Sequence, residues 1–286
     1  MNPGIHLNLT NEEYHSGPGI SKSGLWTIYT KTPAHYRFEE REEKSRAALD
    51  LGTATHIALL EPETFDTRVA RGPADRRGNK WIDAQNWATA NGAILLTEGD
   101  CDRVSRIRDA GERCDVLRQV RQGAIIEASG YATCPQTGVL MRCRPDAYNP
   151  ALGMILDLKT AREGGPRGFQ KATAEYGYHM QEAFYSDVWN AACDAEGSTP
   201  YRNGSSSFVF VVIESAAPFL VSTYELKPGA VEEGRKAYQA ALTKYATCLE
   251  RERLGMPLAH AWPGYPPEPE PLDIPRWAYK LTEPED

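Results

Sequence analysis

Short apolar runs separated by turn-forming residues occupy the middle of the chain, at 124–132, 139–148 and 153–160. Runs of this length between turn residues are typical of β-strands. In the third run Leu156 and Leu158 stand at alternate positions, and Asp157 and Lys159 fill the positions beside them. Successive side chains of a strand face opposite sides of its sheet. We therefore expect the two leucines to point into a core and the two charged residues to share the other face.

Helical patterns surround these strands. Thr10 can cap a first helix, because Glu13 stands at the capping-box position. Met180, Phe184 and Val188 form an apolar stripe at helical spacing. The expected helices are 11–15, 22–29, 47–60, 80–90, 100–120, 166–174, 178–195 and 228–254, and a further strand pair covers 207–214 and 219–225. The pattern predicts an α/β fold in which helices flank a central mixed β-sheet.

These elements predict one domain over residues 1–260. Its N-terminal part, about 1–65, is helical, and its core covers about 90–255. A basic loop with glycine is expected at 66–80. The last segment, 261–286, is rich in proline, and we expect an irregular tail there.

The loops between the three strands place acidic residues opposite one another. With a two-residue loop at 151–152, paired positions sum to 303, so Asp146 lies opposite Asp157 and Arg144 opposite Lys159. With a four-residue loop at 135–138, paired positions sum to 273, and Glu127 lies opposite Asp146. One face of the predicted hairpin then carries two carboxylates and two cations.

Facing carboxylates repel each other across a strand pair. A divalent cation removes that repulsion, because Mg²⁺ binds one or two carboxylates together with water and substrate phosphate. A neighbouring lysine, here Lys159, can stabilise charge that develops on phosphorus or help to deprotonate an attacking water. The alternative is an ordinary surface hairpin with scattered charges, since two acids and a lysine make a short pattern.

Composition constrains the class of protein less than the strand pattern does. A hydrophobic content of 41% and a charged content of 25% are ordinary for a globular protein. No apolar run approaches the roughly 20 residues of a membrane span, and the first residues lack the pattern of a signal peptide. We therefore expect a cytoplasmic protein. Its six dispersed cysteines argue against zinc or iron–sulfur ligation, and a net charge of −7 counts only mildly against nucleic-acid binding.

Four sequence blocks resemble the RecE-type exonucleases, the exodeoxyribonuclease VIII family of the PD-(D/E)xK nuclease superfamily. In chain order they are Ile20-Ser21-Lys22-Ser23 with Thr32-Pro33-Ala34-His35-Tyr36; Leu51-Gly52-Thr53-Ala54-Thr55-His56 with Leu60-Glu61-Pro62-Glu63-Thr64-Phe65; Glu127, Thr137-Gly138, Arg144-Pro145-Asp146 and Asp157-Leu158-Lys159-Thr160; and Gln181 with Tyr185. They extend from residue 20 to residue 185. The resemblance implies a restriction-endonuclease-like core around the central mixed sheet.

The resemblance also implies roles for these residues. It implies that Mg²⁺, with Mn²⁺ as a substitute, is held by His56, Asp146, Asp157 and the carbonyl of Leu158. It assigns catalysis to Lys159 together with Asp157 and Asp146. Gln181 and Tyr185, four apart and so on one helix face, are expected to contact DNA or orient the lysine. Glu127 either supports a metal-bound water or is a solvated strand residue, and the sequence favours neither alternative.

The expected activity is 5′→3′ degradation of linear double-stranded DNA, which leaves 3′ single strands for phage-type recombination. Its expected partners are DNA ends, a single-strand annealing protein of the RecT type and further copies of the chain in a ring, in the cytoplasm of a bacterial host. Phosphate contacts are expected from Arg142, Arg144, Arg162 and Lys171. The alternatives are another PD-(D/E)xK nuclease of repair or defence, and a non-catalytic protein that binds DNA ends.

Overall fold

A five-stranded mixed sheet forms the centre of the molecule in the computed structural model, which describes residues 1–40, 46–196, 204–205, 207–275 and 279. The strand order is β10-β9-β8-β7-β4. These strands are β4 (Ile125–Ile126), β7 (Ala147–Asn149), β8 (Met154–Ala161), β9 (Ser207–Glu214) and β10 (Val221–Tyr224). β8 and β9 run parallel, whereas the other neighbours are antiparallel. The predicted α/β fold with a mixed sheet is therefore confirmed.

Two smaller sheets flank the central one. The first has the order β1-β5-β6 and consists of β1 (Gly4–His6), β5 (Ser129–Thr133) and β6 (Leu140–Cys143). The second pairs β2 (Val69–Arg71) with β3 (Ile94–Leu96) in parallel. β2 begins inside the segment 66–80, where a loop was expected. Val69 is buried there in a separate small core with residues of α4 (Arg46–Leu60) and α7 (Glu98–Gly111).

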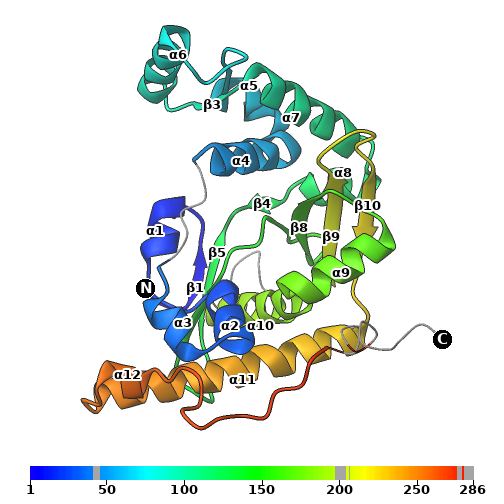
Figure 1. The fold of residues 1–286 in the computed structure, drawn as a ribbon. Helices are drawn as coiled ribbons and strands as arrows, with labels where there is room; N and C mark the ends of the chain where they lie inside the picture. Colours follow the sequence, from blue (N-terminus) through cyan, green and yellow to red (C-terminus); the bar gives the residue numbers. More distant parts are fainter. Residues whose placement is uncertain (41–45, 197–203, 206, 276–278, 280–286) are drawn as a thin grey trace, which may run out of the picture.

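Helices cover both faces of the central sheet (Figure 1). They are α1 (Asn11–Ser16), α2 (Lys22–Thr30), α3 (Pro33–Phe38), α4 (Arg46–Leu60), η1 (Pro62–Thr64), α5 (Phe65–Arg68), α6 (Asn79–Ala90), α7 (Glu98–Gly111), α8 (Asp115–Arg121), α9 (Pro166–Tyr176), α10 (Tyr178–Glu196), α11 (Pro228–Arg253) and α12 (Leu258–Ala261). The single helix expected at 100–120 is divided between α7 and α8. No described helix is long and apolar enough to cross a membrane.

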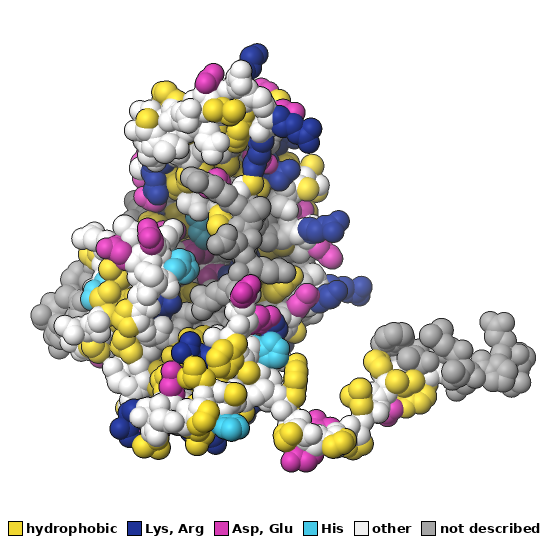
Figure 2. Space-filling view, turned by 60° about the vertical axis from the view of Figure 1, so that its left-hand side comes forward, with side chains coloured by type: hydrophobic (Ala, Val, Ile, Leu, Met, Phe, Trp, Pro, Cys, Tyr) yellow, Lys and Arg dark blue, Asp and Glu magenta, His cyan; other side chains and the backbone are white. Residues whose placement is uncertain are grey.

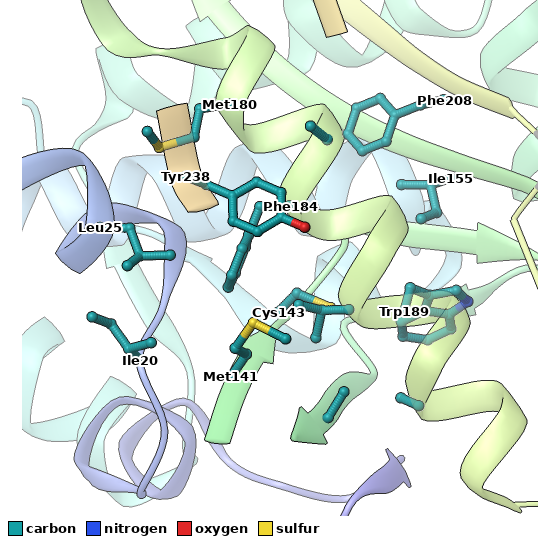
Figure 3. Packing of buried hydrophobic residues seen from close by; sticks show 14 of the residues in the cluster. Ile20, Leu25, Met141, Cys143, Ile155, Met180, Phe184, Trp189, Phe208 and Tyr238 are labelled. Carbon is teal, nitrogen blue, oxygen red and sulfur yellow. The ribbon is translucent and has the colours of Figure 1, made fainter. Parts of the chain in front are cut away.

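The side chains of β8 separate into two cores, as the alternation predicts. Ile155 joins the larger core, in which Phe184 and Trp189 of α10 pack near Phe208 of β9 (Figure 3). Leu156 and Leu158 join the opposite core with residues of α4, α7 and α8. Because the leucines are buried on that side, Asp157 and Lys159 must lie on the side covered by α10.

The pairing sums of both predicted registers are confirmed, but the predicted pairs Asp146–Asp157 and Arg144–Lys159 lie beyond the end of the β7–β8 ladder. The β7–β8 pairs, such as Tyr148 with Ile155, sum to 303, and the β4–β7 and β5–β6 pairs sum to 273. The strands are less continuous than expected, because both members of the first hairpin pass from the small sheet to the central one. Glu127 stands at one of these breaks and takes a φ of 49°, which is strained for a residue with a side chain. Asp146 stands at the other.

One buried acid makes the stability of this fold depend on pH. Glu182 of α10 is 8% exposed, and its Oε2 has no hydrogen-bond partner in the described part of the chain. Burial, reinforced by the nearby Glu225 carboxylate, raises the pKa of Glu182 to about 8. Since the unfolded chain holds this pKa near 4.5, the folded state binds the extra proton between these values. The free energy of unfolding is therefore highest below pH 4.5, and it decreases as the pH rises toward 8.

Replacement of Glu182 by glutamine removes this loss. We expect Glu182→Gln to match the wild type near pH 5 and to exceed it by about 2–4 kcal/mol near pH 9. Urea unfolding at both pH values measures the difference, with the exposed Glu175→Gln as the matched control. An equal effect of Glu182→Gln at both pH values contradicts the prediction.

Candidate active site

The catalytic candidates of β8 lie beneath the start of α10. Asp157 is 2% exposed and forms an ion pair with Lys159. Gln181 joins the pair from α10: its amide nitrogen donates to Asp157 Oδ2, and its Oε1 accepts from the Lys159 ammonium at 3.2 Å. The structure thus brings together three residues that the sequence proposed for the site.

Asp146 lies beside this group because the chain leaves the strand ladder there. Its Oδ2 accepts a hydrogen bond from the backbone amide of Leu158 at 2.6 Å. Its Oδ1 lies 3.6 Å from Nδ1 of His56, which α4 supplies from the other face of the sheet. Figure 2 shows histidine and acidic side chains at the floor of a hollow between the upper and lower parts of the molecule.

The electrostatics of the group are dominated by burial. Burial raises the pKa of Asp146 to about 6, the Asp157 charge adds to the rise, and His56 opposes it. Burial alone lowers the pKa of Lys159, but the carboxylates of Asp157 and Asp146 outweigh it, and the net direction is upward. The lysine is therefore held as an ammonium ion, and the raised pKa of Asp146 lies close to neutral pH.

The donor atoms fit a divalent cation. Oδ1 of Asp157 is buried and contacts the Lys159 ammonium without accepting a hydrogen bond of regular geometry from any described residue. Two carboxylates and an imidazole are donors that Mg²⁺ and Mn²⁺ accept. The described residues nevertheless hold no ready-made cluster of three His, Cys, Asp or Glu ligands. A metal ion at this place would therefore have to bind the Asp157 carboxylate while its oxygens also contact Lys159 and Gln181.

Glu127 and Tyr185 lie at the edge of the group. The amide of Glu127 donates to the carbonyl of Asp146 at 3.1 Å. Burial lowers the pKa of Arg144, and the carboxylate of Glu127 opposes that fall. Burial raises the pKa of Tyr185, and the charges of Asp157 and Asp146 add to that rise, so the phenol stays protonated near the acids. Neither side chain forms a hydrogen bond with Asp157 or Lys159 in the described part of the chain, and their expected roles stay predictions.

Two of the arginines expected to contact phosphates have partners inside the protein. Arg142 is 8% exposed and donates to the carbonyls of Tyr14, His15 and Gly17, which end α1. Arg144 donates to Ser129 Oγ at 2.9 Å, to Asn11 Oδ1 at 2.8 Å and to the carbonyl of Leu9 at 2.9 Å.

These contacts correct one part of the expected hairpin. Arg144 does not stand beside Lys159 on the face of the central sheet, because the strand breaks at this point and Arg144 turns toward α1. Both arginines thus hold the N-terminal segment in place, and their expected phosphate contacts, which would compete with these bonds, stay predictions. Arg162 and Lys171 are exposed just after β8 and on α9, so their expected phosphate contacts stay predictions.

The sequence did not single out Tyr178. The Lys159 ammonium lies 4.6 Å from the centre of its ring, a cation–π contact that restrains the lysine. Tyr178 stands three residues before Gln181, so the two share a helix face. That spacing is the signal in the sequence that could have found it.

The mixed sheet, the two acids and the lysine define a PD-(D/E)xK-type nuclease core. The chain belongs to the family described as PDDEXK-like domain of unknown function (DUF3799), whose model matches residues 29–257. Nucleases of this superfamily generally use divalent metal ions. Among curated proteins, none matches the sequence.

Two solved structures resemble the chain to different degrees. A protein from Eubacterium rectale, provisionally described as an exonuclease, is 14% identical, with a TM-score of 0.56 over 97% of this chain and 99% of that one. A phage-related exonuclease from Haemophilus somnus 129PT is 11% identical over 85% of this chain and 100% of that one, with a TM-score of 0.34. At such identities the first comparison shows the fold alone, and the second is too distant to support an argument.

The charge of Asp146 makes opposite contributions with and without metal. We expect Asp146→Asn to be as stable as the wild type or more stable in metal-free buffer, because a buried carboxylate that resists ionisation is removed. We also expect Mg²⁺ or Mn²⁺ to raise the Tm of the wild type, through binding to the folded state, and to leave the Tm of the variant unchanged. Thermal unfolding with and without each metal measures both effects.

Asp109→Asn removes an exposed acid of α7 and serves as the control. It should keep the metal-induced rise in Tm. An equal rise in Asp146→Asn contradicts the assignment of Asp146 as a ligand.

Proposed function

We propose that this protein is a metal-dependent exodeoxyribonuclease of the RecE type, which degrades linear double-stranded DNA from 5′ to 3′. The observation that carries the proposal is the contact of Asp157, Lys159 and Gln181 beside Asp146 on one face of a PD-(D/E)xK-type sheet. The sequence blocks that resemble RecE-type exonucleases include all four residues.

His56, Asp146, Asp157 and the carbonyl of Leu158 are the proposed ligands of Mg²⁺ or Mn²⁺. A metal ion held there would lower the pKa of a water molecule and neutralise charge on the phosphate. The other contributions come from the protein itself. The Leu158 amide fixes one oxygen of Asp146, and Gln181 fixes Asp157.

Lys159 acts through its positive charge in this proposal. Two roles are open to such a lysine, to stabilise the charge on the phosphorane or to remove a proton from water. Because the neighbouring acids raise its pKa, the ammonium form is the one present at neutral pH. It therefore stabilises the extra negative charge that forms as water attacks phosphorus in line and the sugar oxygen leaves.

The hydroxyl of Tyr185 and the carboxylate of Glu127 complete the proposed wall of the site. Tyr185 lies near the two acids, and the backbone of Glu127 is bonded to the carbonyl of Asp146, positions that suit contact with DNA or with an ordered water. Arg162 and Lys171 are exposed cations that follow the catalytic strand in sequence, and we propose them as phosphate contacts. The 3′ single strand that remains is the proposed substrate of a RecT-type annealing protein, and a ring of several copies is the proposed active form.

Digestion of end-labelled duplex DNA tests the reaction. We expect wild type with Mg²⁺ or Mn²⁺ to release the 5′ label first and to leave the 3′ label on a long strand. Asp157→Ala, Asp146→Asn and Lys159→Ala should each reduce the rate by at least about 100-fold, because the first two remove a proposed metal ligand and the third removes the charge that stabilises the phosphorane. Glu127→Ala should reduce it only partly.

Exposed charges of the same type provide the controls. Asp109→Asn and Lys236→Ala alter residues at the surface of α7 and α11 and should digest at the wild-type rate. Intact ends with wild type and either metal, or an Asp157→Ala variant as fast as wild type, would rule out the proposed enzyme. Release of the 3′ label first would rule out the polarity alone.

A further inference from the structure

A second lysine, Lys22, comes from the N-terminal helices and lies close enough to the catalytic group for the charges of Lys159 and Asp157 to act on it. Lys22 is the first residue of α2, which packs against α10 (Figure 1). Figure 3 shows Ile20 and Leu25, on either side of Lys22 in sequence, on the same side of the core as Met180 and Phe184 of α10. Burial of these apolar neighbours fixes the start of α2 beside the start of α10.

The corner between α9 and α10 receives α2 at close range. Gly177 forms this corner with a φ of +66°, and a Cβ atom there would lie 2.5 Å from the ring of Trp26. Only glycine therefore allows the corner to approach α2 so closely. As a result, only Gly177 separates Tyr176, which contacts α2, from Tyr178, which contacts Lys159.

The two lysines lie on these two sides. The Lys22 ammonium donates to the carbonyl of Tyr176 and lies 5.2 Å from the centre of the Trp26 ring. The Lys159 ammonium lies over the ring of Tyr178. No described Asp or Glu forms an ion pair with Lys22. Asp157 pairs with Lys159 instead, so a phosphate that reaches Lys22 meets an ammonium group that has no carboxylate partner in the described part of the chain.

The electrostatic surroundings of Lys22 agree with this geometry. Burial lowers the pKa of Lys22 to about 8, and the positive charge of Lys159 adds to the fall, while Asp157 opposes it. Two ammonium groups that repel each other in a partly buried place are stabilised by an anion that contacts both. In a nuclease that anion is a phosphate of the substrate.

We propose that Lys22 binds a phosphate of the DNA strand that is being degraded, next to the phosphodiester that Lys159 faces. This inference rests on the proposed function and extends it to a residue outside the 29–257 region matched by the family model. The phosphate is either an internal phosphodiester or the terminal phosphate of the strand. Both present the same oxygens to an ammonium ion, and the experiment distinguishes them.

The alternative role of Lys22 is structural. A cation at the end of α9 interacts favourably with the last carbonyls of that helix. Lys22→Gln keeps a donor for the Tyr176 carbonyl and removes the charge, whereas Lys22→Arg keeps both. Lys31→Gln is the matched control, because Lys31 ends the same helix and pairs with Glu39 at 2.7 Å at the surface.

The experiment measures equilibrium binding of a fluorescent duplex in EDTA, where no cleavage occurs, over a range of salt concentrations. One phosphate contact contributes about 0.7–0.9 to the slope of log K against log salt. We expect Lys22→Gln to lower the slope by that amount and to bind about fivefold more weakly at low salt. Lys22→Arg and Lys31→Gln should keep the wild-type slope. Thermal unfolding confirms that each variant is folded.

Duplexes with a 5′ phosphate and with a 5′ hydroxyl identify the phosphate. A loss in Lys22→Gln on both duplexes supports an internal phosphodiester, and a loss on the phosphorylated duplex alone supports the terminal phosphate. An unchanged slope in a folded Lys22→Gln overturns the proposal, even if wild type digests DNA as proposed. Wild type that neither binds nor digests either duplex overturns this proposal and the proposed function together.

Discussion

Asp157 is a carboxylate in the central strand of a sheet that is covered on both faces, and its burial constrains much of the surrounding structure. A buried ionised carboxylate costs several kcal/mol unless cations and hydrogen bonds compensate it. Here Lys159 supplies the cation from the same strand, and Gln181 supplies the hydrogen bond from α10. The start of α10 must therefore lie over β8, and the aromatic core beneath that helix holds it there.

The break in the strands next to this pair provides the second requirement of the site. Within a continuous ladder Asp146 would point away from the sheet on a fixed side, opposite another acid. Because the ladder ends at Ala147, the Asp146 carboxylate instead reaches the amide of Leu158 and the imidazole of His56. The left-handed conformation of Glu127 belongs to the same break. Backbone strain thus lies beside the candidate metal ligands, as is common at functional sites.

Local patterns were sufficient for a large part of this arrangement. The two registers follow from loop lengths, since paired positions keep a constant sum until a bulge or a sheet change interrupts them. The capping box of Thr10 and Glu13 is present as predicted. The alternation in β8 assigned Leu156 and Leu158 to the core correctly. Each of these features depends on residues close together in the sequence.

The errors and omissions arise where distant segments meet. Arg142 and Arg144 are arginines beside a catalytic motif, and nothing nearby in the sequence shows that carbonyls at the two ends of α1 accept their hydrogen bonds. The position of Lys22 depends on Gly177 and Trp26, which belong to separate helices. Such contacts depend on packing, which pattern and propensity do not encode.

The sequence by itself determined the residue types of the site, their strands and the faces on which they lie, because these depend on periods and turns within about thirty residues. Only the tertiary structure decided which charges neutralise one another. Ion pairs and hydrogen bonds depend on distances of a few ångströms between side chains, and those distances are set where α4, α10 and the N-terminal helices meet the sheet. For this reason the acids and Lys159 were predictable, whereas the partners of the arginines and the position of Lys22 were not.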